Sequence, residues 1–274
     1  MSDLDVTTAL ELLEAGAITV EGRLVEASNA TLFCHIDLDG VNAECVYKPV
    51  AGERPLWDFP DGTLAAREVA AYAVSEATGW AIVPPTLLRD GPFGPGMVQL
   101  WVDVDPSVGL VDVTSPRRLP AGWLKVLDAL GSNGQPVVLC HADDDRLRRM
   151  SVLDVVLNNA DRKGGHVLPV TSLADQGAGP LGLVHGVDHG VSFHTDTKLR
   201  TVLWGWAGQP LGLEATDVLE RLRADLEGPL GTGLASLLTR AEVRATGRRI
   251  DQLLAAGVLP YPSDGWPAIP WPPF

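Results

Sequence analysis

The 274-residue chain carries 21 basic against 35 acidic residues, a net charge of −14, and 46% of its residues are apolar. Such a chain can bury a sizeable core, and its acidity argues against nucleic acid as a partner. No apolar run reaches the roughly 18 residues that span a bilayer, and the acidic amino terminus is unlike a signal peptide, so we expect a cytoplasmic protein with no integral membrane segment.

The amino-terminal part of the chain predicts a small antiparallel sheet accompanied by helices. Residues 6–15 have the pattern of a short helix, and residues 22–49 contain three strand-like runs separated by polar turns, as in an antiparallel meander. Thr63 as a cap and Gly79 as a terminator delimit an alanine-rich helix. Residues 81–104 read as two more strands around a Gly/Pro turn, which completes five strands by about Val102.

The remainder of the chain is predicted to be mainly helical. Residues 103–120 resemble a linker, and helical patterns follow at residues 121–130, 143–160, 213–228 and 239–257. Two short runs, residues 166–170 and 181–190, are strand-like and can pair with each other. We expect the Trp- and Pro-rich residues 261–274 to dock as an ordered, extended strip on this part of the molecule.

Two polar sequences interrupt apolar runs in this second part. In "LNNADRKGGHVL", Asp161 follows a predicted buried helix, and in "LVHGVDHGVSF", Asp188 stands between a strand-like run and a glycine. In the first part, Lys48 closes the third predicted strand and Glu68 lies within the alanine-rich helix. Each residue alone fits a surface position or an ordinary turn, and only their order along the chain points to a common site.

The order "YKP", "REVAAY", "VPPT", "DRKGGH" and "VDHG" over roughly residues 22–213 resembles the phosphatidylinositol 3- and 4-kinase family. Within it, the type II phosphatidylinositol 4-kinases and an actinobacterial branch of uncharacterised proteins are most similar. The resemblance implies an α+β, bilobal, protein-kinase-like fold. Its N-lobe would be a five-stranded antiparallel sheet plus a helix (residues 1–102), and its C-lobe would be mainly helical (residues 103–274). It also implies ATP and Mg²⁺ as cofactors.

The resemblance assigns a role to each charged residue. Lys48 would contact the α- and β-phosphates and Glu68 would hold it in place, while Asp161 would accept the proton of the attacking hydroxyl. Lys163 is a further candidate for phosphate or acceptor contact, and Asp188 would hold the metal.

Several features of this region leave alternatives open. His166 falls where the family has a metal-binding asparagine, so it would bind Mn²⁺, contact phosphate as an imidazolium, or do neither. Arg162 fits equally well a structural role, in which it forms an ion pair with a neighbouring carboxylate and so shapes the loop.

Nucleotide-binding groups are expected at two further places. The first hairpin lacks a glycine-rich loop, and Ser28 and Asn29 would offer polar groups to phosphate there, although a simple polar turn fits the sequence equally well. The adenine is expected beside Gln99, Leu100 and Trp101, whose backbone groups would face it.

The acceptor is not fixed by these residues. Lys198, Arg200, Trp204 and Trp206 follow Asp188, a mixture that suits a phosphorylated headgroup, although we favour packing for the two tryptophans. No polybasic patch indicates a membrane, so the expected acceptor is a protein serine or threonine or a small polyol or inositol compound. The alternatives are a nucleotide-binding pseudokinase that regulates a protein partner and an enzyme that transfers AMP on the same fold.

Overall fold

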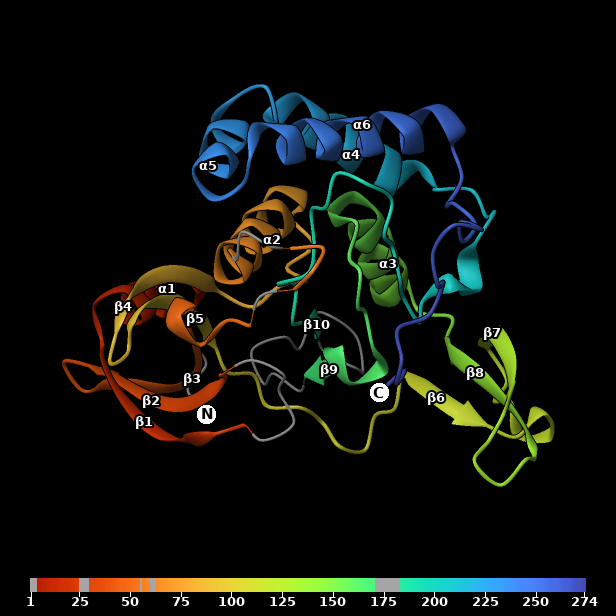
Figure 1. The fold of residues 1–274 in the computed structure, drawn as a ribbon, viewed down its shortest axis with the longest axis horizontal. Coiled ribbons are helices and arrows are strands. Elements are labelled where there is room, and N and C mark those ends of the chain that lie inside the picture. Colours follow the sequence, from red (N-terminus) through yellow and green to blue (C-terminus); the bar gives the residue numbers. More distant parts are fainter. Residues whose placement is uncertain (1–3, 25–29, 55, 60–62, 171–182) are drawn as a thin grey trace.

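The computed structural model describes residues 4–24, 30–54, 56–59, 63–170 and 183–274 and has the predicted α+β class. Five strands form an antiparallel sheet in the order β1-β2-β3-β5-β4 (Figure 1). The out-of-sequence place of β4 arises because helix α2 intervenes between β3 and β4. The strands are β1 (Ala17–Arg23), β2 (Leu32–Leu38), β3 (Val41–Pro49), β4 (Thr86–Gly91) and β5 (Gly94–Leu100).

The first helix, α1 (Val6–Ala15), covers one face of this sheet as predicted. The Asp5 carboxylate accepts the N–H of Thr8 at 3.0 Å and so caps the helix. Leu12 and Leu13 are buried against apolar side chains of the sheet, among them Ile36, in a hydrophobic cluster of their own. The sheet and α1 therefore share a small core that is separate from the larger hydrophobic cluster.

Helix α2 (Leu64–Thr78) is present as predicted, but its cap is not the predicted one. Thr63 has a left-handed backbone, with φ of 70°, and its side chain makes no capping bond. The Glu53 carboxylate instead accepts the N–H groups of Leu64 and Ala65, at 3.2 and 2.8 Å. A carboxylate at a helix amino terminus satisfies free N–H groups and interacts favourably with the helix dipole. The helix ends at Gly79, with φ of 73°, as predicted.

The prediction of a helix at residues 121–130 is wrong, because this segment is strand β7 (Trp123–Leu130). It pairs with β8 (Pro136–Ala142), which also pairs with β6 (Val111–Thr114) inside the predicted linker. The β7 ladder shifts register between Lys125 and Leu127, which disturbs the alternation by which a strand is recognised. The second part of the chain therefore contains a three-stranded sheet, at the lower right of Figure 1, and is less helical than predicted.

The other predicted helices are present and gather on one side of the molecule (Figure 1). Helix α5 was not predicted, because two glycines interrupt its apolar pattern. The short strands β9 (Val167–Val170) and β10 (Leu183–Gly186) pair antiparallel, as predicted. The helices are α3 (Asp145–Leu157), α4 (Leu213–Asp225), α5 (Pro229–Leu237) and α6 (Arg240–Ala256).

The larger hydrophobic core lies among these helices and includes one side of α2. Ala70, Ala71 and Val74 of α2 are fully buried in the cluster that also holds Leu153 of α3 and Leu222 of α4. Helix α2 thus packs against the helical part of the molecule, and it follows β3 of the five-stranded sheet in the chain. Polar residues of α2 can therefore lie between the sheet and the helical part. Within the described residues, no helix has the length and apolarity needed to cross a membrane.

Candidate active site

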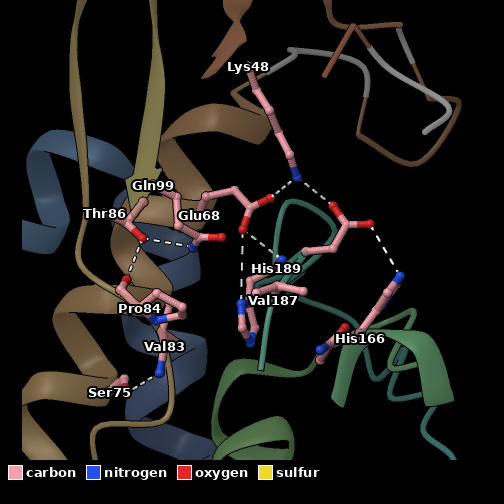
Figure 2. Close-up of polar contacts among 12 residues, drawn as sticks. Lys48, Glu68, Ser75, Val83, Pro84, Thr86, Gln99, His166, Val187 and His189 are labelled. Carbon is pink, nitrogen blue, oxygen red and sulfur yellow. Dashed lines mark hydrogen bonds and ion pairs between the residues drawn. The ribbon is translucent and has the colours of Figure 1, made fainter. Parts of the chain in front are cut away.

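The site is centred on Lys48, near the end of β3. Its ammonium lies 2.7 Å from Glu68 Oε1 and 2.7 Å from Asp188 Oδ1, although the three residues are far apart in the sequence. Burial opposes the charged form of Lys48, but the two carboxylates outweigh it and raise the pKa of the ammonium. The ion pair predicted between Lys48 and Glu68 is therefore present, and Figure 2 shows the two side chains directed toward each other.

Glu68 links α2 to the "VDHG" segment as well as to Lys48. Its carboxylate is almost completely buried, and burial raises its pKa while the nearby Lys48 opposes that shift. The oxygen not bound to Lys48, Oε2, accepts the backbone N–H of His189 at 2.8 Å. Glu53, which follows Lys48 by five residues, accepts N–H groups at the start of α2 and does not compete for Lys48.

Asp188 has a left-handed backbone, with φ of 61°, and a half-exposed side chain. A non-glycine residue in this region is strained, and such strain occurs often at functional sites. Lys48 and, to a lesser degree, His166 lower the pKa of the Asp188 carboxyl far below its usual range. The carboxylate is therefore ionised at neutral pH, and the oxygen not bound to Lys48 lies 3.5 Å from His166 Nε2.

His166 stands beside Asp188 as a neutral ring. Burial, helped by nearby cations, lowers its pKa to about 4, which argues against the imidazolium considered from the sequence. Its Nδ1 lies 3.5 Å from the backbone N of Lys163, and its Nε2 faces the Asp188 carboxylate. A neutral ring whose Nδ1 accepts the Lys163 N–H has its proton on Nε2, where it can donate to Asp188.

Asp161 lies in the loop after α3, close to two cations. Lys163 Nζ is 3.5 Å from Oδ2, and Arg200 Nη2 is 3.8 Å from Oδ1. Burial outweighs these charges and raises the pKa of the carboxyl. The loop is fixed by Asn159, whose Oδ1 accepts the Asp161 N–H at 3.0 Å. Asp161 is thus held in position, and neither of its carboxylate oxygens forms an ion pair shorter than 3.5 Å with the described residues.

Beneath the loop lies a buried network that the sequence did not reveal in full. Arg162 is completely buried, and its Nε and Nη2 donate to the equally buried Asp154 of α3. Its Nη1 donates to Val187 O at 3.0 Å, and its Nη2 donates to His189 Nε2 at 2.6 Å. Arg162 therefore joins the "DRKGGH" loop to the "VDHG" segment. Asp154 was overlooked, although a lone carboxylate in the apolar run "MSVLDVVL" is the signal that marks it.

The residues predicted to bind nucleotide are less well supported. Ser28 and Asn29 lie outside the described residues. The Gln99 side chain is buried and donates to Thr86 Oγ1 at 2.8 Å. The N–H groups of Leu100 and Trp101 donate to Pro85 O and Glu44 O, at 2.9 and 3.0 Å. Neither N–H is free to bind adenine, so a nucleotide there would have to use carbonyl groups or residues that follow Trp101.

The described residues can hold a magnesium ion whose remaining ligands come from the substrate. Among the described residues, no group of three or more His, Cys, Asp or Glu side chains is placed to hold a metal. Mg²⁺ in phosphotransferases is usually bound by one or two carboxylates together with substrate phosphates. Asp188 meets that requirement because its carboxylate is ionised and half exposed, and His166, the other predicted ligand, places Nε2 3.5 Å from it.

Comparison with known proteins places the chain in a family. Protein Rv2133c of Mycobacterium tuberculosis is 51% identical over 272 residues, which cover 96% of this chain and 94% of that protein. The chain belongs to the Rv2133c family. No family model matches the sequence, and the resemblance to phosphatidylinositol kinases stays a prediction.

Among solved structures, the Helicobacter pylori proinflammatory kinase CtkA is similar to the chain. It matches with a TM-score of 0.44 and 11% sequence identity, over 89% of this chain and 94% of that chain. At this level the similarity is no basis for assigning a function.

Proposed function

We propose that the protein is an ATP- and divalent-metal-dependent phosphotransferase of the phosphatidylinositol 3-/4-kinase-like type. One observation carries the proposal: Lys48 of β3 contacts both Glu68 of α2 and Asp188 of the "VDHG" segment at 2.7 Å. In protein kinases, a lysine on the third strand, a glutamate of the following helix and a metal-binding aspartate are the groups that position ATP. Residues 1–102 would form the N-lobe and residues 103–274 the C-lobe.

Each group has a role in this proposal. Lys48 binds the phosphates of ATP, and Asp188 holds Mg²⁺ or Mn²⁺, which neutralises phosphate charge when bound. The acceptor oxygen forms a bond to the γ-phosphorus, the bond to the ADP oxygen breaks, and the acceptor proton passes to Asp161. Lys163, 3.5 Å from Asp161, contacts the transferred group or the acceptor.

The acceptor is proposed to be a protein hydroxyl or a small polyol or inositol compound. The cation nearest in sequence to Arg200, Lys198, is already engaged. Its ammonium lies 3.1 Å from Asp58 Oδ2 and is enclosed by the rings of Trp57 and Trp266, 4.6 and 4.1 Å from their centroids. It is therefore not free for an anionic headgroup, which leaves Lys163 and Arg200 to face an acceptor beside Asp161.

A nucleotide-binding pseudokinase is the second candidate, and His166, at the position of the phosphatidylinositol kinase family's metal-binding asparagine, favours it. If the only metal-binding group at the site is Asp188, nucleotide binding without transfer is the expected result of a weakened metal site. Adenylyl transfer on the same fold is kept as an outcome of the test, although no contact in the site favours it.

The experiment is intact-mass spectrometry of the protein and of candidate acceptors after incubation with ATP and Mg²⁺ or Mn²⁺, with release of ADP measured in parallel. A phosphotransferase gives a phosphate adduct and ADP, whereas an AMP transferase gives an adenylyl adduct. The Asp161→Asn variant serves as the inactive control. Nucleotide binding of equal strength in Mg²⁺ and in EDTA, with no adduct and no ADP, would overturn the proposal in favour of the pseudokinase.

A further inference from the structure

The last nine residues of the sequence, residues 266–274, run along the candidate site and make backbone contacts with it. Ala268 O accepts the N–H of Thr201 at 3.1 Å and the Nε1–H of Trp204 at 2.8 Å. Pro273 O accepts the N–H of Gly164, inside the "DRKGGH" loop, at 2.8 Å. In Figure 1 the carboxyl terminus lies beside β9, the strand that follows this loop. We call residues 266–274 the tail strip.

Gly164 is shaped to receive the end of this strip. A Cβ atom at Gly164 would collide with the ring of Phe274, whereas a Cβ at Gly165 would meet none of the described residues within 4 Å. The two adjacent glycines of the loop therefore differ in their surroundings. The missing side chain of Gly164 makes room for the aromatic ring, and this contact gives a physical reason for a glycine at that position.

The tail contact gives the loop a second anchor, so that Lys163 stands between Gly164 and the buried Arg162. On one side, Arg162 is fixed in the buried network with Asp154 and Val187. On the other side, Gly164 is held by Pro273 O and by the Phe274 ring. Lys163 lies between these two anchors, and its Nζ approaches the Asp161 carboxylate at 3.5 Å. Loss of the second anchor would free the part of the loop that sets this approach.

We propose that Pro273 and Phe274 are positioning residues, which hold the loop of Asp161 and Lys163 in its reactive shape from the end of the chain. The catalytic part of this inference rests on the proposed function. The restraint of the loop does not, because it follows from the contacts of Gly164 alone. The two parts are therefore tested by separate measurements.

Restraint of the loop is tested by amide hydrogen exchange over residues 161–166 in the full-length protein without nucleotide. We expect Phe274→Ala to speed exchange of the Gly164 amide, because its acceptor Pro273 O is no longer held. Trp271→Ala is the matched control, since this tail aromatic is 85% exposed and should leave exchange unchanged. Unchanged exchange in Phe274→Ala would overturn the proposal.

A double variant tests the ring contact independently. Gly164→Ala should lower the melting temperature in the wild-type background but much less in the Phe274→Ala background, where the colliding ring is absent. Gly165→Ala, with open space around it, is the control and should have little effect. Equal losses for Gly164→Ala in both backgrounds would show that the ring does not occupy this space and would overturn the proposal.

The catalytic part is tested by steady-state release of ADP from Mg·ATP. We expect kcat of Phe274→Ala to fall about tenfold or more with KM for ATP within about threefold, because misplacing a catalytic group by about 1 Å can cost about 10²-fold. Phe274→Leu should recover part of the loss. Wild-type kcat in a variant with faster exchange would overturn the positioning role. If the wild type itself releases no ADP, the proposed function fails, and exchange and the double variant still decide whether the tail restrains the loop.

Discussion

Asp188 combines an ionised carboxylate with a left-handed backbone at the proposed metal site. Replacement by asparagine removes a formal charge from the proposed metal ligand, so Asp188→Asn should weaken Mg·ATP binding much more than binding of metal-free ATP. Calorimetry with and without Mg²⁺ measures the difference. A variant that binds Mg·ATP like the wild type and still transfers phosphate would remove Asp188 from the site.

Asp161 is expected to act on the acceptor and not on the nucleotide. Asp161→Asn should abolish transfer while the affinity for ATP stays within about threefold, because a base contributes little to holding nucleotide. Phosphate transfer and ATP affinity are measured on the same preparation. Unchanged turnover in this variant would exclude Asp161 from catalysis.

The buried Arg162–Asp154 ion pair is expected to contribute to the stability of the fold. Both side chains are fully buried, so Arg162→Met leaves an uncompensated buried carboxylate and should cost about 3–5 kcal/mol in the free energy of unfolding. Chemical denaturation measures this loss. The exposed pair Lys125–Asp128 is the control, since Lys125→Met should cost about 1 kcal/mol or less. A loss as small in Arg162→Met would mean that the network is not needed for the fold.

Among the structural elements, helix α2 has an N-terminal cap that could not be predicted from the sequence. Glu53 caps it from eleven residues upstream of Leu64, while Thr63 has a left-handed backbone that suits glycine better. We expect Glu53→Ala to cost about 1 kcal/mol in unfolding free energy and Thr63→Gly to be neutral or stabilising. Thermal unfolding of both variants decides the point. A larger loss in Thr63→Gly than in Glu53→Ala would restore the threonine cap.

Elements with a strong local pattern could be predicted from the sequence, and those fixed by distant partners could not. Helices α1, α2, α3, α4 and α6 and the five-stranded sheet follow from periodicity and turn residues. Strand β7 was taken for a helix because its apolar spacing fits both periods once the bulge is included, and only its pairing with β8 decides between them.

The same distinction applies to the site. Lys48, Glu68, Asp161 and Asp188 were found through their order along the chain, and the structure brings Lys48, Glu68 and Asp188 into direct contact. An ion pair of Arg162 and docking of the tail were expected, but their partners, Asp154 and Gly164, depend on tertiary packing and follow from no spacing in the sequence.

At the scale of the whole molecule, two charged residues of α2, Arg67 and Glu68, bind it to the second part of the chain. Arg67 donates to Ser192 O and to Glu242 of α6, and Glu68 accepts the His189 N–H. Outward rotation of α2 would break all three contacts and leave buried charges unpaired. The arrangement therefore favours the state in which Lys48 and Glu68 are in contact.

The stability of the molecule is expected to fall in mild acid, and His141 contributes to this fall. Its Nδ1–H donates to Ala142 O and its Nε2 accepts the Gly205 N–H, so only the neutral ring suits the fold, and burial lowers its pKa. A lowered folded-state pKa gives stability that is complete above the unfolded value of about 6.5 and is lost as pH falls below it.

The melting temperature measured from pH 7.5 down to pH 5 tests this contribution. His141→Gln should melt lower at pH 7.5 but lose less on acidification than the wild type, because one titrating group is gone. The exposed pair Lys125–Asp128 again supplies a control, since Lys125→Met should leave the slope unchanged. Parallel curves for His141→Gln and the wild type would show that His141 does not contribute to acid sensitivity.

The contact between Gly164 and Phe274 also has an evolutionary consequence. A larger residue at position 164 requires the half-exposed Phe274 ring to move away, so substitutions at these two positions should tend to occur together among relatives of this chain. Position 165, which has open space around it, should vary independently of the tail. Lineages that lose the aromatic residue at position 274 would no longer require glycine at position 164. The two positions should therefore be correlated in an alignment of relatives.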